Sequence, residues 1–308
     1  MKIVVMGTGG VGGLYGGILA KSGCDVGFVA RGAHLAALKA NGLRVESQIA
    51  GDFTLPKISV SDGPGGFGPA DLVLMTTKAY DLESAARSLL PVLHRQSMVL
   101  PLLNGVDIAE RLAAIVGPER VLGGMCQVSS SIKAPGVVKQ VGPLNRIVFG
   151  ELQGGSSTRA RSVLDMFRGA GVAADLSEQI QVELWKKFLM ICAAGGMSAL
   201  CRSTLGPILK DPDTLALLAG CMQEIEALAR RKGVALPADI VQKTLAGMQK
   251  LPPEMRPSMG LSALNGQPLE LDALNGTAAR IGREIGVATP VNRFITTALK
   301  LVAGGKQS

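Results

Sequence analysis

Residues 1–17 read MKIVVMGTGGVGGLYGG and contain an apolar run, a glycine cluster and a second apolar pattern in immediate succession. Lys2 to Met6 is short and rich in β-branched residues, which is typical of a buried strand. Gly7, Gly9 and Gly12 follow with the spacing G-x-G-x-x-G, and the apolar residues beyond them recur at helical intervals. In this context the motif predicts a dinucleotide-binding turn, because its glycines permit a tight turn, close approach of a diphosphate and close helix–strand packing.

The same stretch also has features of a secretory or lipoprotein signal, with one lysine, an apolar segment and then Cys24. However, seven glycines in the first twenty residues make a poor apolar helix, and Lys21 lies too close to Cys24 for a small-residue cleavage site. We therefore favour the dinucleotide turn, in which the diphosphate would bind free N–H groups at the positive end of a helix dipole.

The composition predicts a soluble globular protein of two domains, with 308 residues, 47% hydrophobic and 3% aromatic. No apolar run reaches the length of a membrane span, since the longest, residues 188–201, is interrupted by Gly195, Gly196 and Ser198. The five cysteines are odd in number and scattered without metal-ligand spacing, which favours reduced core thiols in the cytoplasm and no bound metal.

The net charge of +8 comes from dispersed basic residues with few aromatics, which argues against nucleic acid as a partner. Attraction of small anionic ligands explains the excess more simply. The two histidines, His34 and His94, lie in segments that we expect to be surface helices.

Three polar residues follow expected strands of the N-terminal half. Arg31 follows the strand at 24–30, Lys78 the strand at 70–77, and Asn104 the strand at 98–103. Ligands of doubly wound sheets bind outside the carboxyl ends of the strands, so all three can face one crevice. Arg31 stands where NAD-binding folds carry an acid, and a cation there favours the 2′-phosphate of NADP. The alternative is a solvated arginine at a strand end.

The remaining pattern predicts an α/β fold, a doubly wound Rossmann-type sheet over residues 1–176 followed by an all-helical C-terminal domain over residues 177–308. Further strands are expected at 43–47, 53–60, 120–128, 137–141, 147–150 and 172–176, with helices at 34–41, 82–93 and 158–168. Beyond about residue 178 we expect helices at 179–201, 213–232, 237–249, 271–285 and 291–301.

Over nearly its full length the chain resembles the ketopantoate reductases (2-dehydropantoate 2-reductases), enzymes of pantothenate biosynthesis. The matching pieces are GTGGVGG, Arg31, TTKAY around Lys78, LNG around Asn104, ELWKKF around Lys187, PSM around Ser258, ELDALNG around Glu270, and TPVN at residues 289–292. The resemblance implies NADPH-dependent reduction of a small-molecule 2-keto acid, in a cleft between a Rossmann domain and a helical domain. It implies cofactor contacts from Gly7, Thr8, Gly9, Gly10, Val11, Gly12, Arg31, Lys78, Asn104 and Glu270.

By the same resemblance Lys187 is the catalytic lysine. Hydride addition to a ketone creates an alkoxide, and a nearby ammonium can donate the proton and stabilise the charge. The alternative is a surface ion pair with Glu183, four residues earlier on the same helix.

Three other residues take roles from the family. Asn104 would position the lysine or the cofactor ribose, Ser258 would hold the substrate carboxylate, and Glu270 would accept a hydrogen bond from the substrate hydroxyl as a second catalytic residue. The alternatives are a helix N-cap for Ser258 and an ordinary first-turn acid for Glu270.

The chain departs from the family in the expected substrate pocket. Ile191 and Gly195 stand where the family typically has asparagines, and Ser262 replaces an acid often found four residues after the serine. Ketopantoate is therefore one candidate substrate, and a more apolar 2-keto acid is another. A non-catalytic NADP-binding sensor is a third interpretation, against which the retention of Lys187 and Glu270 argues. The sequence leaves a homodimer open.

Overall fold

The computed structural model describes residues 1–305, and the chain divides into two compact units. Unit 1 comprises Met1–Leu103 and Asp107–Ile180, and unit 2 comprises Asn104–Val106 and the chain from Gln181 onward. The predicted fold class is confirmed, because a parallel α/β sheet comes first and a helical region follows. The boundary expected between residues 176 and 177 lies just before helix α6 (Ile180–Cys201).

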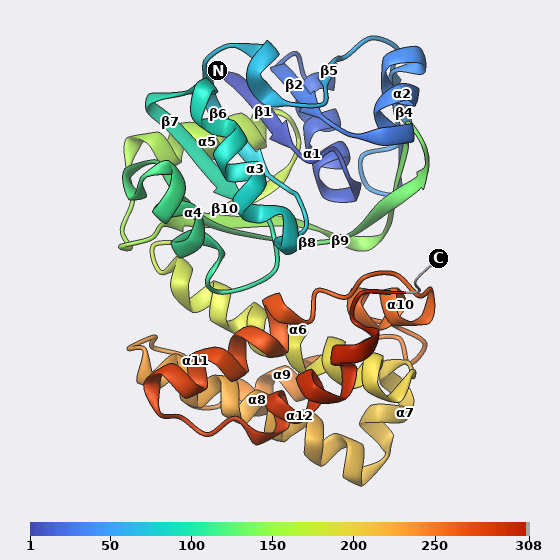
Figure 1. Ribbon diagram of the computed structural model, residues 1–308, viewed down its shortest axis with the longest axis vertical. Helices are drawn as coiled ribbons and strands as arrows, with labels where there is room; N and C mark the ends of the chain where they lie inside the picture. The colour runs from blue at the N-terminus through green and yellow to red at the C-terminus, as the bar shows by residue number, and fades with distance from the viewer. Residues whose placement is uncertain (306–308) are drawn as a thin grey trace. The chain divides into compact units, whose positions relative to one another are not determined.

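The first sheet of unit 1 is parallel throughout (Figure 1). Its strand order is β5 (Ser59–Ser61), β2 (Asp25–Val29), β1 (Lys2–Met6), β6 (Ala70–Met75) and β7 (Leu93–Pro101). Ile3, Val4 and Val5 of the central strand are fully buried, as expected where both faces of a parallel sheet are covered. Met6 pairs with both Val29 and Met75, so the carboxyl ends of β1, β2 and β6 are level.

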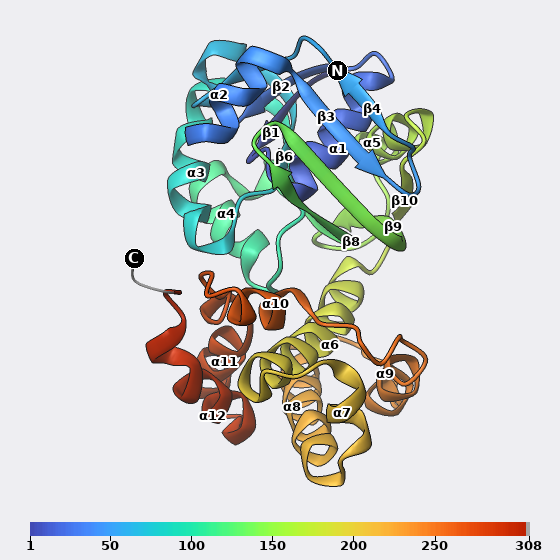
Figure 2. The same cartoon turned by 90° about the vertical axis from the view of Figure 1, so that its right-hand side faces the viewer.

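The second sheet is mixed rather than parallel. It contains β10 (Ala173–Leu176), β9 (Val137–Glu151), β3 (Leu43–Ser47) and β4 (Phe53–Leu55) in that order, with β8 (Leu122–Ala134) antiparallel to β9 (Figure 2). The three shorter strands expected at 120–128, 137–141 and 147–150 were wrong, because two long strands, β8 and β9, cover this part of the chain. A register shift between Val128 and Ser129 lets β9 pass through Gly142 and Pro143, because a bulge tolerates a proline within a strand.

Helix α1 (Gly10–Lys21) contacts both sheets, and its glycines explain how. A Cβ atom at Gly16 would lie 2.7 Å from Val5 of the first sheet, and one at Gly13 would lie 2.6 Å from Val138 of the second. Larger side chains at either position would push the sheet away from the helix. The glycines beyond the motif therefore allow α1 to pack between two sheets.

The other helices of unit 1 are α2 (Gly32–Asn41), α3 (Leu82–Leu89), α4 (Ile108–Val116) and α5 (Thr158–Gly169), with 3₁₀ turns η1 (Pro64–Phe67), η2 (Ala79–Asp81), η3 (Leu90–Val92) and η4 (Pro118–Arg120). Helix α4 was not expected from the sequence. His34 lies in helix α2 as predicted, whereas His94 lies in strand β7, so the helix expected around it was wrong.

The regular structure of unit 2 consists of helices and helical turns in its described part (Figures 1 and 2). After α6 come α7 (Leu205–Lys210), α8 (Pro212–Arg231), α9 (Ile240–Met248), α10 (Ser258–Leu264), a π-helical turn η5 (Asp272–Gly276), α11 (Thr277–Ile285), α12 (Pro290–Leu299) and the 3₁₀ turn η6 (Lys300–Val302). Helix α7 was not expected, and a helix near α10 was considered only through the alternative role of Ser258 as an N-cap. The helix expected at 271–285 begins instead with the π-helical turn.

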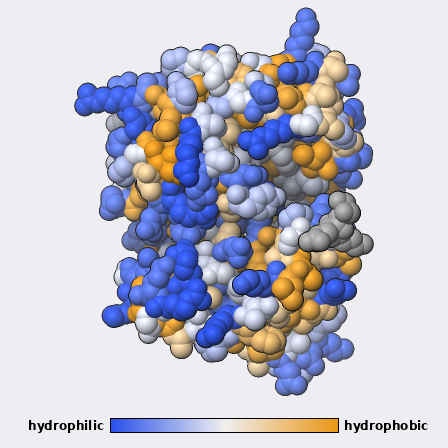
Figure 3. Space-filling model, viewed as in Figure 1, coloured by the Kyte–Doolittle hydropathy of each residue, from blue (hydrophilic) through white to orange (hydrophobic). Residues whose placement is uncertain are grey.

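Helix α6 is the central helix of this unit and packs in its apolar core. Among residues 1–305 it is the single helix long and apolar enough to cross a membrane, but 67% of its most apolar window is buried, as in the core helix of a globular protein. The face of the molecule in Figure 3 shows hydrophilic residues interspersed with small groups of hydrophobic ones.

All five cysteines are free thiols, and Cys126, Cys192 and Cys221 are buried. Burial raises the pKa of Cys192 and of Cys221, so both stay protonated at neutral pH. Within the described part of the chain no group of histidine, cysteine and acidic residues could hold a metal ion.

Candidate functional site

The glycine turn joins strand β1 to helix α1 in unit 1. Gly7 has a positive φ of 102°, a conformation that favours glycine, and the Thr76 hydroxyl donates to its carbonyl oxygen at 2.8 Å. The Thr8 backbone and hydroxyl both donate to Val29 O at 2.8 Å, which fixes the turn to the end of β2. Gly9 is the N-cap of α1 and supplies no capping side chain.

This turn fits a dinucleotide diphosphate. The first-turn N–H groups of an α-helix have no partner within the helix, and α1 offers them without a side-chain cap. A Cβ atom at Gly9 would have no neighbour within 4 Å, so no contact inside the protein requires glycine there. Close approach of a diphosphate to the backbone would require it. Gly12 is different, since a Cβ atom there would lie 2.2 Å from Gly7 O.

Arg31 and Lys78 lie at the same edge of the first sheet as the glycine turn. Arg31 is the N-cap residue of α2, directly beyond β2, and Lys78 follows β6. Both side chains are exposed. The Arg31 side chain makes no hydrogen bond or ion pair with any other described residue, so its guanidinium is available to a ligand. The level strand ends bring Gly7, Arg31 and Lys78 to one edge, as the sequence predicted for Arg31 and Lys78. Asn104, the third residue expected there, groups with unit 2, so its place in the same crevice stays a prediction.

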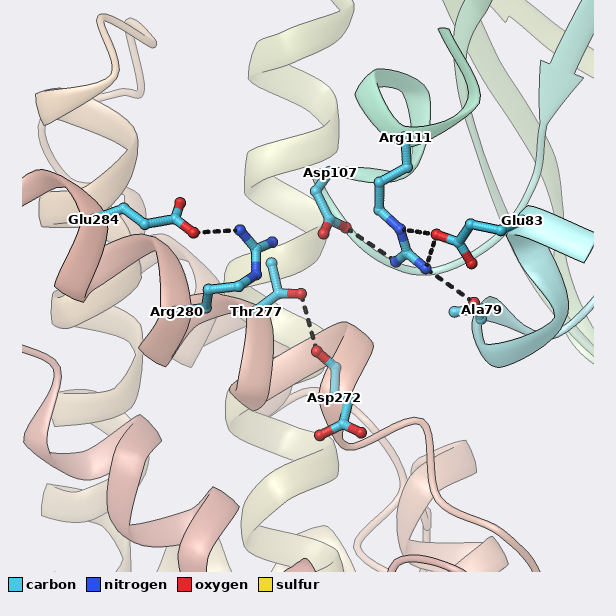
Figure 4. A network of polar contacts seen from close by, with 8 residues as sticks. All are labelled: Ala79, Glu83, Asp107, Arg111, Asp272, Thr277, Arg280 and Glu284. Atoms are coloured by element: carbon cyan, nitrogen blue, oxygen red, sulfur yellow. Dashed lines mark hydrogen bonds and ion pairs between the residues drawn. The ribbon is translucent and has the colours of Figure 1, made fainter. Parts of the chain in front are cut away.

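Arg111 of α4 braces this edge and was missed from the sequence. Its Nε donates to Glu83 Oε1 at 2.8 Å and its Nη2 to Ala79 O at 3.3 Å, and its Nη1 lies 3.8 Å from Asp107 Oδ1 (Figure 4). Burial alone would raise the pKa of Glu83, but the hydrogen bond from Arg111 and nearby charges hold it below its usual value. The arginine therefore ties the turn after Lys78 to the start of α4.

Unit 2 carries the residues to which the family gives catalytic and substrate-binding roles. They are Asn104, Lys187, Ile191, Ser258 and Glu270. Asn104 precedes Gly105, whose φ of 125° gives the tight turn expected from the LNG motif.

Lys187 lies on helix α6 and is partly buried. The neighbouring rings of Trp185 and Phe188 are buried with their centroids 5.8 Å apart, and they hold this part of α6 in the apolar core of unit 2. Glu183, considered from the sequence as an ion-pair partner of Lys187, pairs with Lys186 at 2.9 Å.

Ile191 and Gly195 follow Lys187 at four-residue intervals, so the three share one face of α6. Ile191 packs against the apolar core of the unit. At Gly195 a Cβ atom would lie 3.4 Å from Met259 Cβ, so buried Met259 occupies the space beside the glycine. The polar groups expected on this face are replaced by apolar ones, and Met259 was not singled out from the sequence.

Ser258 and Glu270 lie between helix α9 and the π-helical turn η5, at the two ends of residues 258–270. Ser258 is the first residue of α10 and is exposed; Pro257 holds the N-cap position, so the capping role considered for Ser258 was wrong. Glu270 is partly buried and lies two residues before the π-helical turn, rather than in the first turn of a regular helix. Farther along, the Thr277 hydroxyl donates to Asp272 O at 2.9 Å, which closes this turn onto α11 (Figure 4).

Together these features define a class of protein. A G-x-G-x-x-G turn at the edge of a parallel sheet, followed by a helical unit, is the architecture of a dinucleotide-dependent oxidoreductase. The particular family follows from comparison: residues 3–154 match the model of ketopantoate reductase PanE/ApbA, and residues 179–303 match that of its C-terminal domain. The chain belongs to this family, which confirms the resemblance and identifies an oxidoreductase that uses a nicotinamide cofactor.

Individual relatives agree with this assignment. An uncharacterized oxidoreductase of Bacillus subtilis (strain 168), YkpB, is 31% identical over 99% of this chain and 100% of its own length. The crystal structure of 2-dehydropantoate 2-reductase from Geobacter metallireducens GS-15 has a TM-score of 0.90 at 32% identity, over 98% of this chain and 99% of that one. A ternary structure of D-mandelate dehydrogenase with NADH and anilino(oxo)acetate has a TM-score of 0.89 over 98% of each chain, and at 23% identity it shows the shared fold alone.

Proposed function

We propose that this protein reduces a 2-keto acid to the 2-hydroxy acid with NADPH, with 2-dehydropantoate to pantoate as the reference reaction. The observation that carries the proposal is the glycine turn together with Arg31 at the next strand end, whose side chain has no partner among residues 1–305. The chain also keeps Lys187 and Glu270. A binder without turnover would have no need of a lysine that can act as a proton donor.

Each residue then has a defined task. Arg31 binds the 2′-phosphate, and the first-turn N–H groups of α1 bind the diphosphate. Bound NADPH supplies the hydride. Lys187 donates a proton to the carbonyl oxygen of the substrate and stabilises the charge that develops there.

The remaining groups orient the substrate and the lysine. Ser258 holds the substrate carboxylate, Glu270 accepts a hydrogen bond from the hydroxyl, and Asn104 positions the lysine or the cofactor ribose. The free, buried cysteines fit a reducing cytoplasm as the place of action. A small-molecule 2-keto acid is then the partner, without nucleic acid or membrane, and a homodimer is the assembly to test first.

A second candidate substrate is a 2-keto acid with a more apolar tail. Ile191 and Met259 line the Lys187 face of α6 with carbon atoms, and neither can hydrogen-bond a terminal hydroxyl. Losing a polar partner for a buried substrate group costs a site selectivity for that group. The D-mandelate dehydrogenase that shares this fold was solved with anilino(oxo)acetate, which carries an aromatic ring.

The test is a panel assay of the purified protein. NADPH oxidation is followed with 2-dehydropantoate, with aliphatic 2-keto acids of increasing size and with aromatic ones, each also with NADH. We expect turnover with at least one 2-keto acid and a preference for NADPH. Tight NADPH binding without turnover of any member would instead support the sensor interpretation.

A further inference from the structure

Two asparagines lie in the apolar core of unit 2 with no exposed surface, Asn275 and Asn292. They belong to the motifs ELDALNG and TPVN, which the proposed reaction uses only through Glu270. Fully buried amides in such a core are expected to serve a specific purpose, because burying a polar group is unfavourable unless it is hydrogen-bonded.

The two side chains join four helical segments. Asn275 Nδ2 donates to Cys192 O of α6 at 3.2 Å and to Asn292 Oδ1 at 2.9 Å. Asn292 Nδ2 donates to Glu224 Oε2 of α8 at 2.7 Å. The Glu224 carboxylate also accepts from the backbone N–H groups of Val291 at 2.7 Å and of Asn292 at 2.9 Å, at the start of α12.

The two asparagines differ in how completely they are satisfied. Asn275 Oδ1 is buried and accepts no hydrogen bond from the described residues. It faces Gly196 of α6, where a Cβ atom would lie 2.8 Å away from it. Leaving a buried acceptor without a partner is destabilising, so stability alone does not account for an asparagine at this position.

The position of Asn275 suggests its purpose. It lies in the π-helical turn Asp272–Gly276, which begins two residues after Glu270, and π-helical turns recur at functional sites. Its partner Cys192 lies just over one helical turn beyond Lys187 on α6. The hydrogen bond from Asn275 to Cys192 therefore connects the two segments that carry the lysine and the glutamate.

We propose that Asn275 is a positioning residue that fixes Glu270 relative to Lys187, by holding the π-helical turn against α6. This inference rests on the proposed function, in which the two residues act on the same substrate molecule. A misplacement of about 1 Å can cost about a hundredfold in rate, so a loosened contact is felt chiefly in kcat.

The main variant is Asn275→Leu, which keeps the size of the side chain and removes its amide. We expect kcat to fall at least tenfold, while KM for NADPH changes less than threefold. Glu224→Gln is the control within the same network, because it weakens the cap of α12 and leaves the contact between Asn275 and Cys192. It should lower Tm by a similar amount and leave kcat per folded molecule unchanged.

A second pair of variants perturbs the contact between Asn275 and helix α6 through a residue of α6 instead of through Asn275. Gly196→Ala places a methyl group against Asn275 Oδ1 and should lower kcat in the same way. Gly247→Ala of α9 is its match, since a Cβ atom there meets no atom within 4 Å, and its kcat should equal that of the native protein.

The outcomes separate this inference from the proposed function. Should Asn275→Leu and Gly196→Ala lower Tm but keep native kcat per folded molecule, Asn275 is structural only and the inference is wrong. If the native protein reduces no 2-keto acid, the proposed function fails. The contact between Asn275 and Cys192 can then be tested through the acetylation rate of Lys187, measured relative to that of Lys186. An unchanged ratio in Asn275→Leu would overturn the inference; a shifted ratio supports it.

Discussion

Gly9 and Gly12 belong to one motif, but the structure gives a different reason for glycine at each position. Packing of helix α1 on strand β1 requires Gly12, whereas only a bound ligand would require Gly9. A pair of alanine variants tests the two reasons separately. In Gly12→Ala the new methyl group would lie 2.2 Å from Gly7 O, 2.5 Å from Thr76 Oγ1 and 2.8 Å from Val5 Cγ1. Such contacts force α1 away from β1. In Gly9→Ala the methyl group meets no protein atom within 4 Å.

The expected losses of stability follow from these contacts. Overpacking at Gly12 costs about 1–3 kcal/mol, and losing the bond from Thr76 to Gly7 costs about 0.5–1.5 kcal/mol more. The gain in helix propensity returns about 0.5–1 kcal/mol. The net loss is about 0.5–4 kcal/mol, and its centre of about 2 kcal/mol corresponds to a Tm lower by about 4–8 °C for a unit of this size. At Gly9 only the poorer N-cap matters, so we expect a loss of about 0.5 kcal/mol.

For NADPH affinity we expect the reverse order of the two variants, with the larger loss in Gly9→Ala. The methyl group of Gly9→Ala would occupy the path of the diphosphate and weaken NADPH binding at least tenfold, or about 1.4 kcal/mol. Thermal unfolding without ligand measures the first quantity, and titration of NADPH fluorescence measures the second. Native NADPH affinity in Gly9→Ala would show that the cofactor does not lie on this turn. A native Tm in Gly12→Ala would refute the packing argument.

Three further variants test the proposed site. Arg31→Ala should raise KM for NADPH at least tenfold and leave NADH nearly unchanged, since a charged hydrogen bond to phosphate contributes about 1.5–3 kcal/mol; equal use of both cofactors by the native protein would contradict this. Lys187→Ala should lower kcat by about a hundredfold or more while NADPH still binds, and intact turnover would place the proton donor elsewhere. Ile191→Asn should shift the specificity constant toward 2-dehydropantoate and away from apolar 2-keto acids, and a strong native preference for 2-dehydropantoate would refute the apolar pocket.

The sequence was sufficient to predict which edge of the first sheet carries the glycine turn, Arg31 and Lys78, because that edge is built from local signals. A buried strand, the spacing of three glycines and a cation after the next strand each lie within a short stretch, and parallel strands necessarily end at the same edge. The sandwiching of α1 was not predictable in this way. Gly13 and Gly16 are extra glycines in the sequence, but only the structure shows that a second sheet lies against the first of them.

The errors in the fold have a common cause, which is that tertiary contacts override local pattern. Gly142 and Pro143 would normally end a strand, yet β9 continues past them because β8 pairs with it on both sides of a bulge. Helix α10 is short and follows a proline-rich segment, so it shows no helical periodicity of its own. It packs closely on α6, since a Cβ atom at Gly195 would lie 3.4 Å from Met259 Cβ and one at Gly260 would lie 2.2 Å from Ser198 Oγ.

The candidate site also contains residues that local pattern reveals and residues that it does not. The former are expected to contact a ligand, and the latter hold other residues in place. Arg31 and Lys187 could be singled out because their chemistry matches a phosphate and an alkoxide. Arg111 and Asn275 could not, because a residue that holds others is defined by its partners. Arg111 contacts Glu83 across 28 positions, and Asn275 contacts Cys192 across 83. From sequence alone the first resembles any surface arginine and the second any turn asparagine, so rules that rank residues by their own chemistry will miss the groups that set the geometry of such a site.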